Sequence, residues 1–403
     1  MIESSPPYAP AQDAALRAEL TAAAQRVVPL LAGHAEEGER LRRVPDQAVD
    51  ALREAGMLRL GTPRALGGPG AGVRTCMEVS AELARGDGSA AWIAIIFAGG
   101  GVIASMLEAP AREEIWGQDP DARVAASLTP SGTGTGTGTA DGDLVISGRW
   151  NWTSGIDHAR WVILALAPGA ADEAPRLAVV PTGEVAVEDT WHVAGMAGTG
   201  SSTVVADRVR VPAHRILDLN SVLTGAYASR HPDEPLIAGA VASVLSLTVV
   251  APLLGMARGA LDLTLDTAAR KPMSLSTYER LADAPSVQLA AADAASLIDT
   301  AHLHAYRAAD DLDRACAEGR HLTVAERARV RMDTGVTAVR SREAVDRLVS
   351  VAGGSGFALA NPLQRIWRDL GVASRHGVVN PDLAREIYGR SLLGIADQPT
   401  FMI

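Results

Sequence analysis

The spacing of hydrophobic positions divides the chain into three parts. Between residues 11 and 118, apolar residues recur every three or four positions, as in "AQDAALRAELTAAAQRVVPLLAG", which predicts amphipathic helices. Pro45 and Gly56 stand where a helix would begin and end around "DQAVDALREA". From about residue 121 the pattern changes to short β-branched runs bounded by Gly, Pro and Asp, and after about residue 230 the helical period returns.

These patterns predict an α+β protein with a helical N-terminal domain (1–118), a middle β domain (119–230) and a C-terminal helical bundle (231–403). The strands are expected to pair antiparallel, and "GTGTGTGTADGD" (132–143) is expected to be the turn between the first two. The predicted strands are 122–130, 143–152, 161–167, 176–182, 184–189 and 202–212. The predicted bundle helices are 236–270, 285–318, 323–354 and 361–377.

Composition limits the classes of function. The 403 residues are 47% hydrophobic and 21% charged, which is typical of a globular protein, and the net charge of -10 argues against a nucleic-acid partner. Two distant cysteines and an N-terminus without a signal peptide favour the cytoplasm. The uncharged runs 90–107 and 236–256 approach membrane-spanning length but lack basic flanks, so we expect buried core helices rather than a membrane protein.

Common catalytic motifs are absent. The chain has no G-x-G-x-x-G before a helix, no Walker loop, no HExxH and no GxSxG. His302 and His304 stand two positions apart on a predicted helix, where their rings point in different directions. The sequence therefore predicts no dinucleotide fold, no metal site and no nucleophile triad.

Two strand ends carry candidate binding residues. "ASLTPSG" (126–132) and "GRWNWTSG" (148–155) both end in small hydroxyl residues and glycine. Trp152 offers a flat apolar face beside the hydroxyls of Thr153 and Ser154, which suits a planar heteroaromatic ligand such as a flavin ring. An ordinary core tryptophan beside two turn residues would give the same pattern. Aromatic residues make up only 4% of the chain, so no dense stacking cage is expected.

The stretch "VAGGSGFALANPLQRIWRDLG" contains a second candidate. Gly354 lies in a glycine turn between two predicted helices, where the backbone would be able to approach a phosphate or a neighbouring subunit. A simple linker between helices is the alternative. His192, in a loop before the last strand, is expected to be structural.

Five stretches in this order resemble the acyl-CoA dehydrogenase superfamily over nearly the whole chain. They are "EAGMLRLGTPRALGGPGAG", "ASLTPSG" with "GRWNWTSGIDHARWVIL", "GTGSSTVVADRVRVP", "LLGMARGALDLTLDTAARK" and "VAGGSGFALANPLQRIWRD". The resemblance implies a helical domain, a middle antiparallel β-barrel domain that contacts a flavin ring, and a C-terminal four-helix bundle. Dehydrogenases of this family remove a proton with a carboxylate. No acid occurs between Asp369 and Asp382, nor in "APLLGM", so thioester desaturation is disfavoured.

The chain is more similar to the family's flavin-dependent monooxygenase branch in "DTWHVAGMAGTGS", "NPLQRIWRDL" and His376. This resemblance implies a cytoplasmic homotetramer that takes reduced FMN, or FAD, from a separate NAD(P)H-dependent flavin reductase. With dioxygen, a flavin hydroperoxide would hydroxylate a small aromatic or polyketide-type substrate. The alternatives are an acyl-CoA dehydrogenase-like desaturase, an amino-sugar N-oxygenase and a flavin-free binding subunit. Many members of the branch have a histidine at the position of Gly371.

The resemblance also implies roles for individual residues. His376 would act as a base toward a phenol or as a hydrogen-bond donor. Ser154 would stand beside it at the reacting centre. His158 would be a second polar group that contacts the substrate. On a continuous helix Asp369 would lie about 10 Å from His376, too far to orient it. The expected cofactor contacts are Ser127, Thr129, Trp152, Thr153 and Ser154 at the ring, and Arg270, Gln288 and Gly354 at the tail, where Arg270 and Gln288 would reach across a subunit interface.

Overall fold

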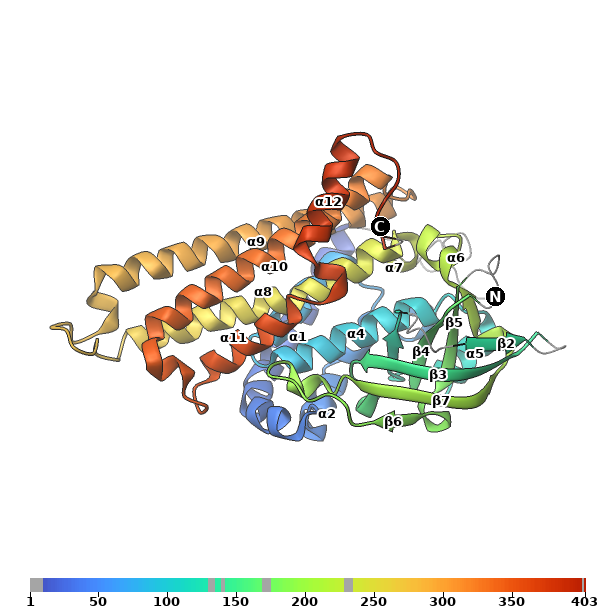
Figure 1. Ribbon diagram of the computed structural model, residues 1–403, viewed down its shortest axis with the longest axis horizontal. Helices are drawn as coiled ribbons and strands as arrows, with labels where there is room; N and C mark the ends of the chain where they lie inside the picture. The colour runs from blue at the N-terminus through green and yellow to red at the C-terminus, as the bar shows by residue number, and fades with distance from the viewer. Residues whose placement is uncertain (1–9, 130–134, 139–141, 169–174, 228–234, 401) are drawn as a thin grey trace.

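The computed structural model describes residues 10–129, 135–138, 142–168, 175–227, 235–400 and 402–403. Long C-terminal helices extend to one side of the molecule and the strands lie on the other, with the helix Gly88–Ala104 (α4) between them (Figure 1). One hydrophobic core runs through all three parts. The pocket described below lies where the three parts meet.

The N-terminal part is helical, as predicted. Its α-helices are α1 (Pro10–Leu41), α2 (Asp46–Glu54), α3 (Val73–Ala84), α4 and α5 (Ala109–Trp116). The carboxylate of Asp87 caps α4 by accepting hydrogen bonds from the backbone N–H groups of Ser89 and Ala90. Burial raises the pKa of Asp87 to about 6, although these bonds favour the charged form. Because α4 is buried on nearly every face, its apolar composition belongs to the protein core.

The middle part contains two four-stranded sheets. The strand order of the first sheet is β1-β4-β5-β8, formed by Val124–Ser127, Trp161–Leu166, Arg176–Pro181 and Ile216–Asp218. The strand order of the second sheet is β2-β3-β7-β6, formed by Thr135–Gly138, Leu144–Thr153, Ser202–Val211 and Ala186–Glu188. All described strand pairs are antiparallel, as expected, except β1 and β4, which are parallel. The segment predicted to be a turn contains β2, because its alternating Thr residues pair with β3, and β8 was not predicted.

The C-terminal part begins with α6 (Leu219–Thr224) and α7 (Pro235–Ala238). The four bundle helices are α8 (Val241–Ala268), α9 (Pro285–Ala317), α10 (Val324–Ala352) and α11 (Pro362–Ala373), followed by α12 (Pro381–Leu392). The helix predicted over 361–377 ends earlier, at Ala373, so His376 lies in the turn between α11 and α12.

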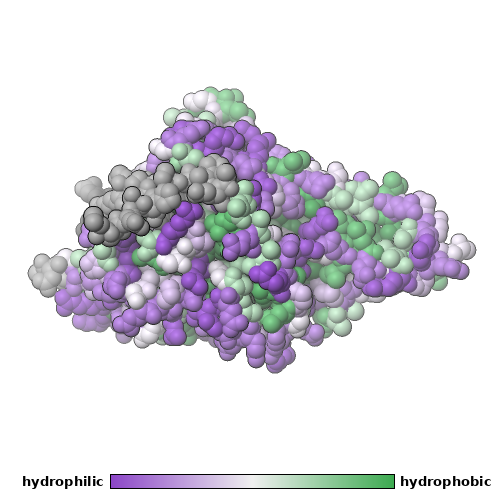
Figure 2. Space-filling model, turned by 180° about the vertical axis from the view of Figure 1, so that it is seen from behind, coloured by the Kyte–Doolittle hydropathy of each residue, from purple (hydrophilic) through white to green (hydrophobic). Residues whose placement is uncertain are grey.

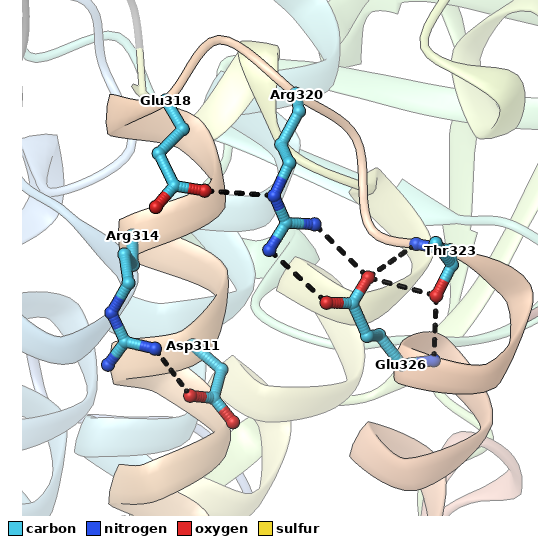
Figure 3. A network of polar contacts seen from close by, with 6 residues as sticks. All are labelled: Asp311, Arg314, Glu318, Arg320, Thr323 and Glu326. Atoms are coloured by element: carbon cyan, nitrogen blue, oxygen red, sulfur yellow. Dashed lines mark hydrogen bonds and ion pairs between the residues drawn. The ribbon is translucent and has the colours of Figure 1, made fainter.

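Polar contacts fix the turn between α9 and α10. Thr323 and Glu326 form a capping box at the start of α10. The guanidinium of Arg320 contacts Glu318 and Glu326, so a single side chain joins the end of α9 to the start of α10 (Figure 3). These bonds orient α10, the helix that supplies one wall of the pocket.

In the part of the chain that the structure describes, only α8 is both long and apolar enough to cross a membrane. The structure buries 89% of its most apolar window inside the protein. Packing of α8 against α3, α9, α10 and α11 therefore accounts for its composition, as the sequence predicted for this run.

Candidate active site

A pocket of about 1190 Å³ opens between the β domain, α4 and the C-terminal helices. Its walls contain four of the seven tryptophans in the chain: Trp92, Trp152, Trp191 and Trp367. No dense stacking cage is visible in the sequence, but the fold brings four tryptophans that are distant in sequence to the walls of one pocket. Pockets for single drug-sized ligands hold about 300–1,000 Å³, so this one has room for a ring system and a second molecule.

Trp152 forms the β-domain wall of this pocket. The register between β3 and β7 shifts between Trp150 and Thr153, and Trp152 has a φ of 61°, in the left-handed region that a bulky residue rarely adopts. The bulge leaves the Trp152 side chain 73% exposed, while the neighbouring Trp150 is fully buried and donates to the carbonyl of Ala165 at 2.7 Å. A strained backbone that presents a large apolar ring outward is typical of a ligand site.

A chain of hydrogen bonds lies along the pocket wall. Trp92 Nε1 donates to Ser154 Oγ at 3.2 Å, and Ser154 Oγ lies 2.8 Å from Ser201 Oγ. Ser201 Oγ lies 2.7 Å from Thr199 Oγ1, which donates to the carbonyl of Met196 at 2.8 Å. These residues come from α4, the end of β3 and the loop before β7, and all five line the pocket. The chain fixes the hydroxyl of Ser154 at the pocket surface.

His376 lies opposite, against the edge of Trp92. The two ring centroids are 5.5 Å apart with an interplanar angle of 65°. Although the pocket leaves part of His376 exposed, desolvation by the surrounding protein, followed by the positive charge of Arg331, lowers its pKa to about 4. Among the described residues, neither ring nitrogen has a hydrogen-bond partner. At neutral pH the imidazole is therefore uncharged and available to a ligand as donor or acceptor.

Asp369 holds the loop that forms part of the pocket floor. Its carboxylate accepts a hydrogen bond from the backbone N–H of Met196, which has a φ of 56°. The Met196 carbonyl also accepts from Trp191 Nε1 at 2.9 Å, so several bonds together stabilise a backbone conformation that is unfavourable for methionine. Burial raises the pKa of Asp369 to about 7. Asp369 therefore positions this loop and does not orient His376, as the sequence predicted.

Two acidic residues line the pocket within the described part of the chain, Glu343 and Asp346. Glu343 accepts from Arg340 Nη1 at 2.6 Å, and Asp346 accepts from Trp367 Nε1 at 3.3 Å. Both carboxylates are engaged with partners on α10 and α11. Neither stands free as a base for proton abstraction from a thioester.

Four expected site residues line this pocket together: Thr129, Trp152, Ser154 and His376. Gly371 lines it as well, and a Cβ added there would meet nothing nearer than Arg375 Nη1, at 3.9 Å. The glycine therefore leaves space at the pocket wall that a side chain would fill.

Three other expected residues do not line the pocket. Ser127 and Thr153 are buried beneath its wall, with their hydroxyls directed at the carbonyls of Asn151 (3.5 Å) and Trp150 (3.3 Å). The substrate contact expected for His158 is wrong. Its Nε2 lies 2.8 Å from the buried carbonyl of Val44, and desolvation lowers its pKa to about 4, so the ring joins the β domain to the N-terminal helices.

The expected tail-binding residues lie at the far tip of the bundle, outside the pocket. Arg270 follows α8, Gln288 is in the first turn of α9, and Gly354 is in the turn between α10 and α11. Contacts hold these segments together: Lys271 Nζ donates to Ser355 Oγ, and Gln288 Nε2 donates to the carbonyl of Ala282 at 2.9 Å. The structure thus separates these three residues from the ring-binding residues of the same chain.

Sequence reasoning missed several residues that line the pocket. They are Trp92, Trp191, Trp367, Ser201 and Arg331. Trp92 stands in an apolar run whose helix is buried all round, so no amphipathic pattern reveals which side chains face a cavity. Arg331 looks like any charged residue of a long helix. No group of three or more His, Cys, Asp or Glu side chains gathers as a metal site in the described ranges, and His302 and His304 bond to different partners, Ile298 and Asp333.

Comparison with known proteins identifies the family. The family described as Acyl-CoA dehydrogenase, N-terminal domain, matches residues 10–115, and that described as Acyl-CoA dehydrogenase, C-terminal domain, matches residues 247–381. The oxygenase subunit HsaA of a flavin-dependent monooxygenase from Mycobacterium tuberculosis (strain ATCC 25618 / H37Rv) is 31% identical, over 94% of this chain and 97% of its own. The chain belongs to the acyl-CoA dehydrogenase family.

Further relatives of this acyl-CoA dehydrogenase family member are oxygenases. The oxygenase component of an FADH2-dependent resorcinol hydroxylase from Rhizobium sp. (strain MTP-10005) is 33% identical over 92% of each chain. Among solved structures, XiaF from Streptomyces sp. in complex with FADH2 and glycerol superposes with a TM-score of 0.92, at 32% identity over 97% of this chain and 98% of that one. The expected family, its fold and its flavin-dependent monooxygenase branch are confirmed.

Proposed function

We propose that this protein is the oxygenase component of a two-component flavin-dependent monooxygenase. It takes reduced FMN, or FAD in its place, from a separate NAD(P)H-dependent flavin reductase and uses dioxygen to hydroxylate a small aromatic or polyketide-type molecule in the cytoplasm. One observation carries the proposal: the pocket joins an exposed tryptophan and a fixed hydroxyl on one wall to an uncharged histidine on the other, whose ring has no hydrogen-bond partner among the described residues.

The residues present fit a flavin ring. The outward face of Trp152 offers stacking area, and the hydroxyls of Thr129 and Ser154 offer polar contacts to ring nitrogens and oxygens. The volume leaves room for a substrate beside the ring. When bound, a reduced flavin supplies the two electrons that the reduction of dioxygen requires.

The protein's own contribution is positioning, exclusion of water and proton transfer. Four tryptophans make the pocket wall largely apolar, which keeps bulk water from the reacting atoms. His376 is neutral at pH 7 and its ring nitrogens have no partner among the described residues, so the imidazole accepts a hydrogen bond from a phenolic hydroxyl at one nitrogen and donates one from the other. The chain from Trp92 through Ser154 to Ser201 holds the Ser154 hydroxyl in a fixed orientation for the reaction.

The flavin tail is held by a second copy of the chain. Arg270, Gln288 and Gly354 are exposed at the bundle tip and do not line the pocket of their own chain, and Gly354 has no neighbour within 4 Å of a Cβ placed on it. Hydrophobic patches interrupt the polar surface of the bundle half (Figure 2), and Leu275, Leu289 and Leu303 are exposed there. These features support a homotetramer.

The desaturase alternative has little support at the site. Removal of a proton alpha to a thioester needs a free carboxylate; of the two acids that line the described pocket, Glu343 is paired with Arg340 and Asp346 is hydrogen-bonded to Trp367. Anaerobic bleaching of bound oxidised flavin by an acyl thioester would favour that alternative.

Substitution of His376 tests the proposal. The His376→Ala variant is expected to bind reduced FMN like the wild type but to release hydrogen peroxide in place of hydroxylated product. His192→Ala is the matched control, because His192 is exposed and outside the pocket. The measurement is product and peroxide formed per NADH consumed, with a generic flavin reductase, FMN and a panel of phenols analysed for added oxygen.

Two results would contradict the proposal. Full-rate turnover with purified protein, NADH and dioxygen alone would exclude a separate reductase. An unchanged product yield in His376→Ala would remove the catalytic role of that residue. A protein that binds no reduced FMN or FAD would instead be a flavin-free binding subunit.

A further inference from the structure

Arg331 is a buried arginine that lines the active-site pocket. It lies in the first half of α10 and is only 2% exposed. Its Nη1 donates to the carbonyl of Val378 and to Ser246 Oγ, the latter at 3.1 Å. Nε is buried without an acceptor, and Nη2 has no acceptor among the described residues. The Val378 contact places the guanidinium beside the turn that carries His376.

No acidic side chain in the described ranges compensates this charge. Desolvation is the one influence on the Arg331 guanidinium, and it lowers the pKa to about 10. Three further arginines, Arg342, Arg368 and Arg375, line the same pocket. Of the two lining carboxylates, Glu343 pairs with Arg340 and Asp346 accepts from the neutral indole N–H of Trp367, and neither acts on Arg331. A buried charge without a counter-charge is costly to a fold, so its retention beside a ligand pocket points to an anion that the ligand brings.

We propose that the substrate carries a carboxylate and that Arg331 binds it at the end of the pocket lined by α10 and the turn that carries His376. Nη2 is the donor that remains for this ion pair, because Nη1 already donates to Val378 and Ser246 and Nε is sealed from the pocket by surrounding atoms. This inference rests on the proposed function in one respect: it takes the aromatic acid that binds at Arg331 to be the molecule that the enzyme hydroxylates.

The test compares two ligands that differ in charge and little in shape, 4-hydroxybenzoate and 4-hydroxybenzamide. Binding is followed without flavin by tryptophan fluorescence, because four tryptophans line the pocket. The wild type is expected to bind the carboxylate at least about tenfold more tightly, the effect of one charge-assisted hydrogen-bonded pair. Arg331→Met is expected to abolish this preference.

Two further variants make the result specific. Arg327→Met, one turn earlier on α10, removes a half-buried arginine that does not line the pocket, and it is expected to keep the preference. Arg331→Lys retains a positive charge at this position, and it is expected to keep part of the preference if the methionine variant folds poorly.

Three outcomes would overturn the inference: equal binding of the two ligands by the wild type, a preference that survives Arg331→Met, and a preference lost equally in Arg327→Met. A third ligand, 4-nitrophenol, reports by its absorbance whether it is bound as the phenolate. If Arg331 lowered its pKa while the carboxylate showed no advantage, Arg331 would serve the reacting oxygen and the carboxylate proposal would fail. Since these titrations contain no flavin, they are independent of whether reduced FMN binds and supports hydroxylation.

Discussion

Asp369→Asn is expected to change how the stability of the protein depends on pH. Asp369 is buried, and its pKa is raised from the ordinary 3.8 to about 7. Between these values the folded state binds a proton that the unfolded state has released, so the wild type loses stability as the pH rises through this window. The amide of the variant still accepts from the N–H of Met196 but does not ionise, so it lacks this loss.

The magnitude follows from the shift. Roughly three pKa units at about 1.4 kcal/mol each give about 4 kcal/mol. The free energy of unfolding of the variant, relative to the wild type, is therefore expected to rise by about that amount between pH 4 and pH 8. The other titrating groups are shared by the two proteins and cancel in the difference, except Asp87, whose charge contributes to the raised pKa of Asp369.

Chemical denaturation at several pH values measures this difference. Asp313→Asn is the matched control: burial also raises the pKa of Asp313 to about 7, and its carboxylate likewise accepts from backbone N–H groups, those of Val73 and Arg74, but it lies outside the pocket. Both variants should show the pH-dependent gain, and only Asp369→Asn should alter the tryptophan fluorescence of the pocket. Parallel stability curves for the wild type and Asp369→Asn would refute the reasoning.

Three further predictions concern the pocket itself. The pKa of His376 is lowered to about 4, so the yield of hydroxylated product per NADH consumed should stay constant down to about pH 5 and fall only as the imidazole becomes protonated. A fall of this yield near pH 6.5 would contradict the prediction. Gly371→Ala should stabilise α11 by about 0.5–1 kcal/mol in denaturant titrations, since the added methyl meets no clash and alanine favours a helix; a lower midpoint would count against it. Trp152→Gly should raise stability by about 1 kcal/mol by relieving the positive φ, yet weaken reduced FMN binding at least tenfold in anaerobic titrations; tighter binding would exclude a ring contact.

Hydrophobic periodicity predicted the order of the three parts because each is long and strongly patterned. It failed where pairing between distant segments decides the structure. β2 lies in a Thr-Gly repeat with no apolar alternation, and the parallel pairing of β1 with β4 depends on contacts 37 residues apart (Val124 with Trp161). The helix predicted over 361–377 would end at Gly377. Helix α11 instead ends at Ala373, where a turn at Ser374 and Arg375 follows without a glycine or proline to mark it.

The candidate site was predictable on the β side and not on the helical side. Trp152 and Ser154 stand in a short motif at a strand end, where sequence neighbours are also neighbours in space. Trp92 and Arg331 come from helices far apart in the sequence, and only the packed fold places them beside His376. His158 shows the opposite failure, because its position near the motif suggested a ligand contact while its ring is directed at Val44.

The missing side chain at Gly371 leaves the pocket with an adjustable volume. The position faces the cavity, and a Cβ added there meets no atom nearer than 3.9 Å, so a small side chain would reshape the cavity without a clash. Selection can therefore change which molecules this enzyme accepts by single substitutions that leave folding intact. In most cavities the lining side chains also support the fold, and such freedom is lost.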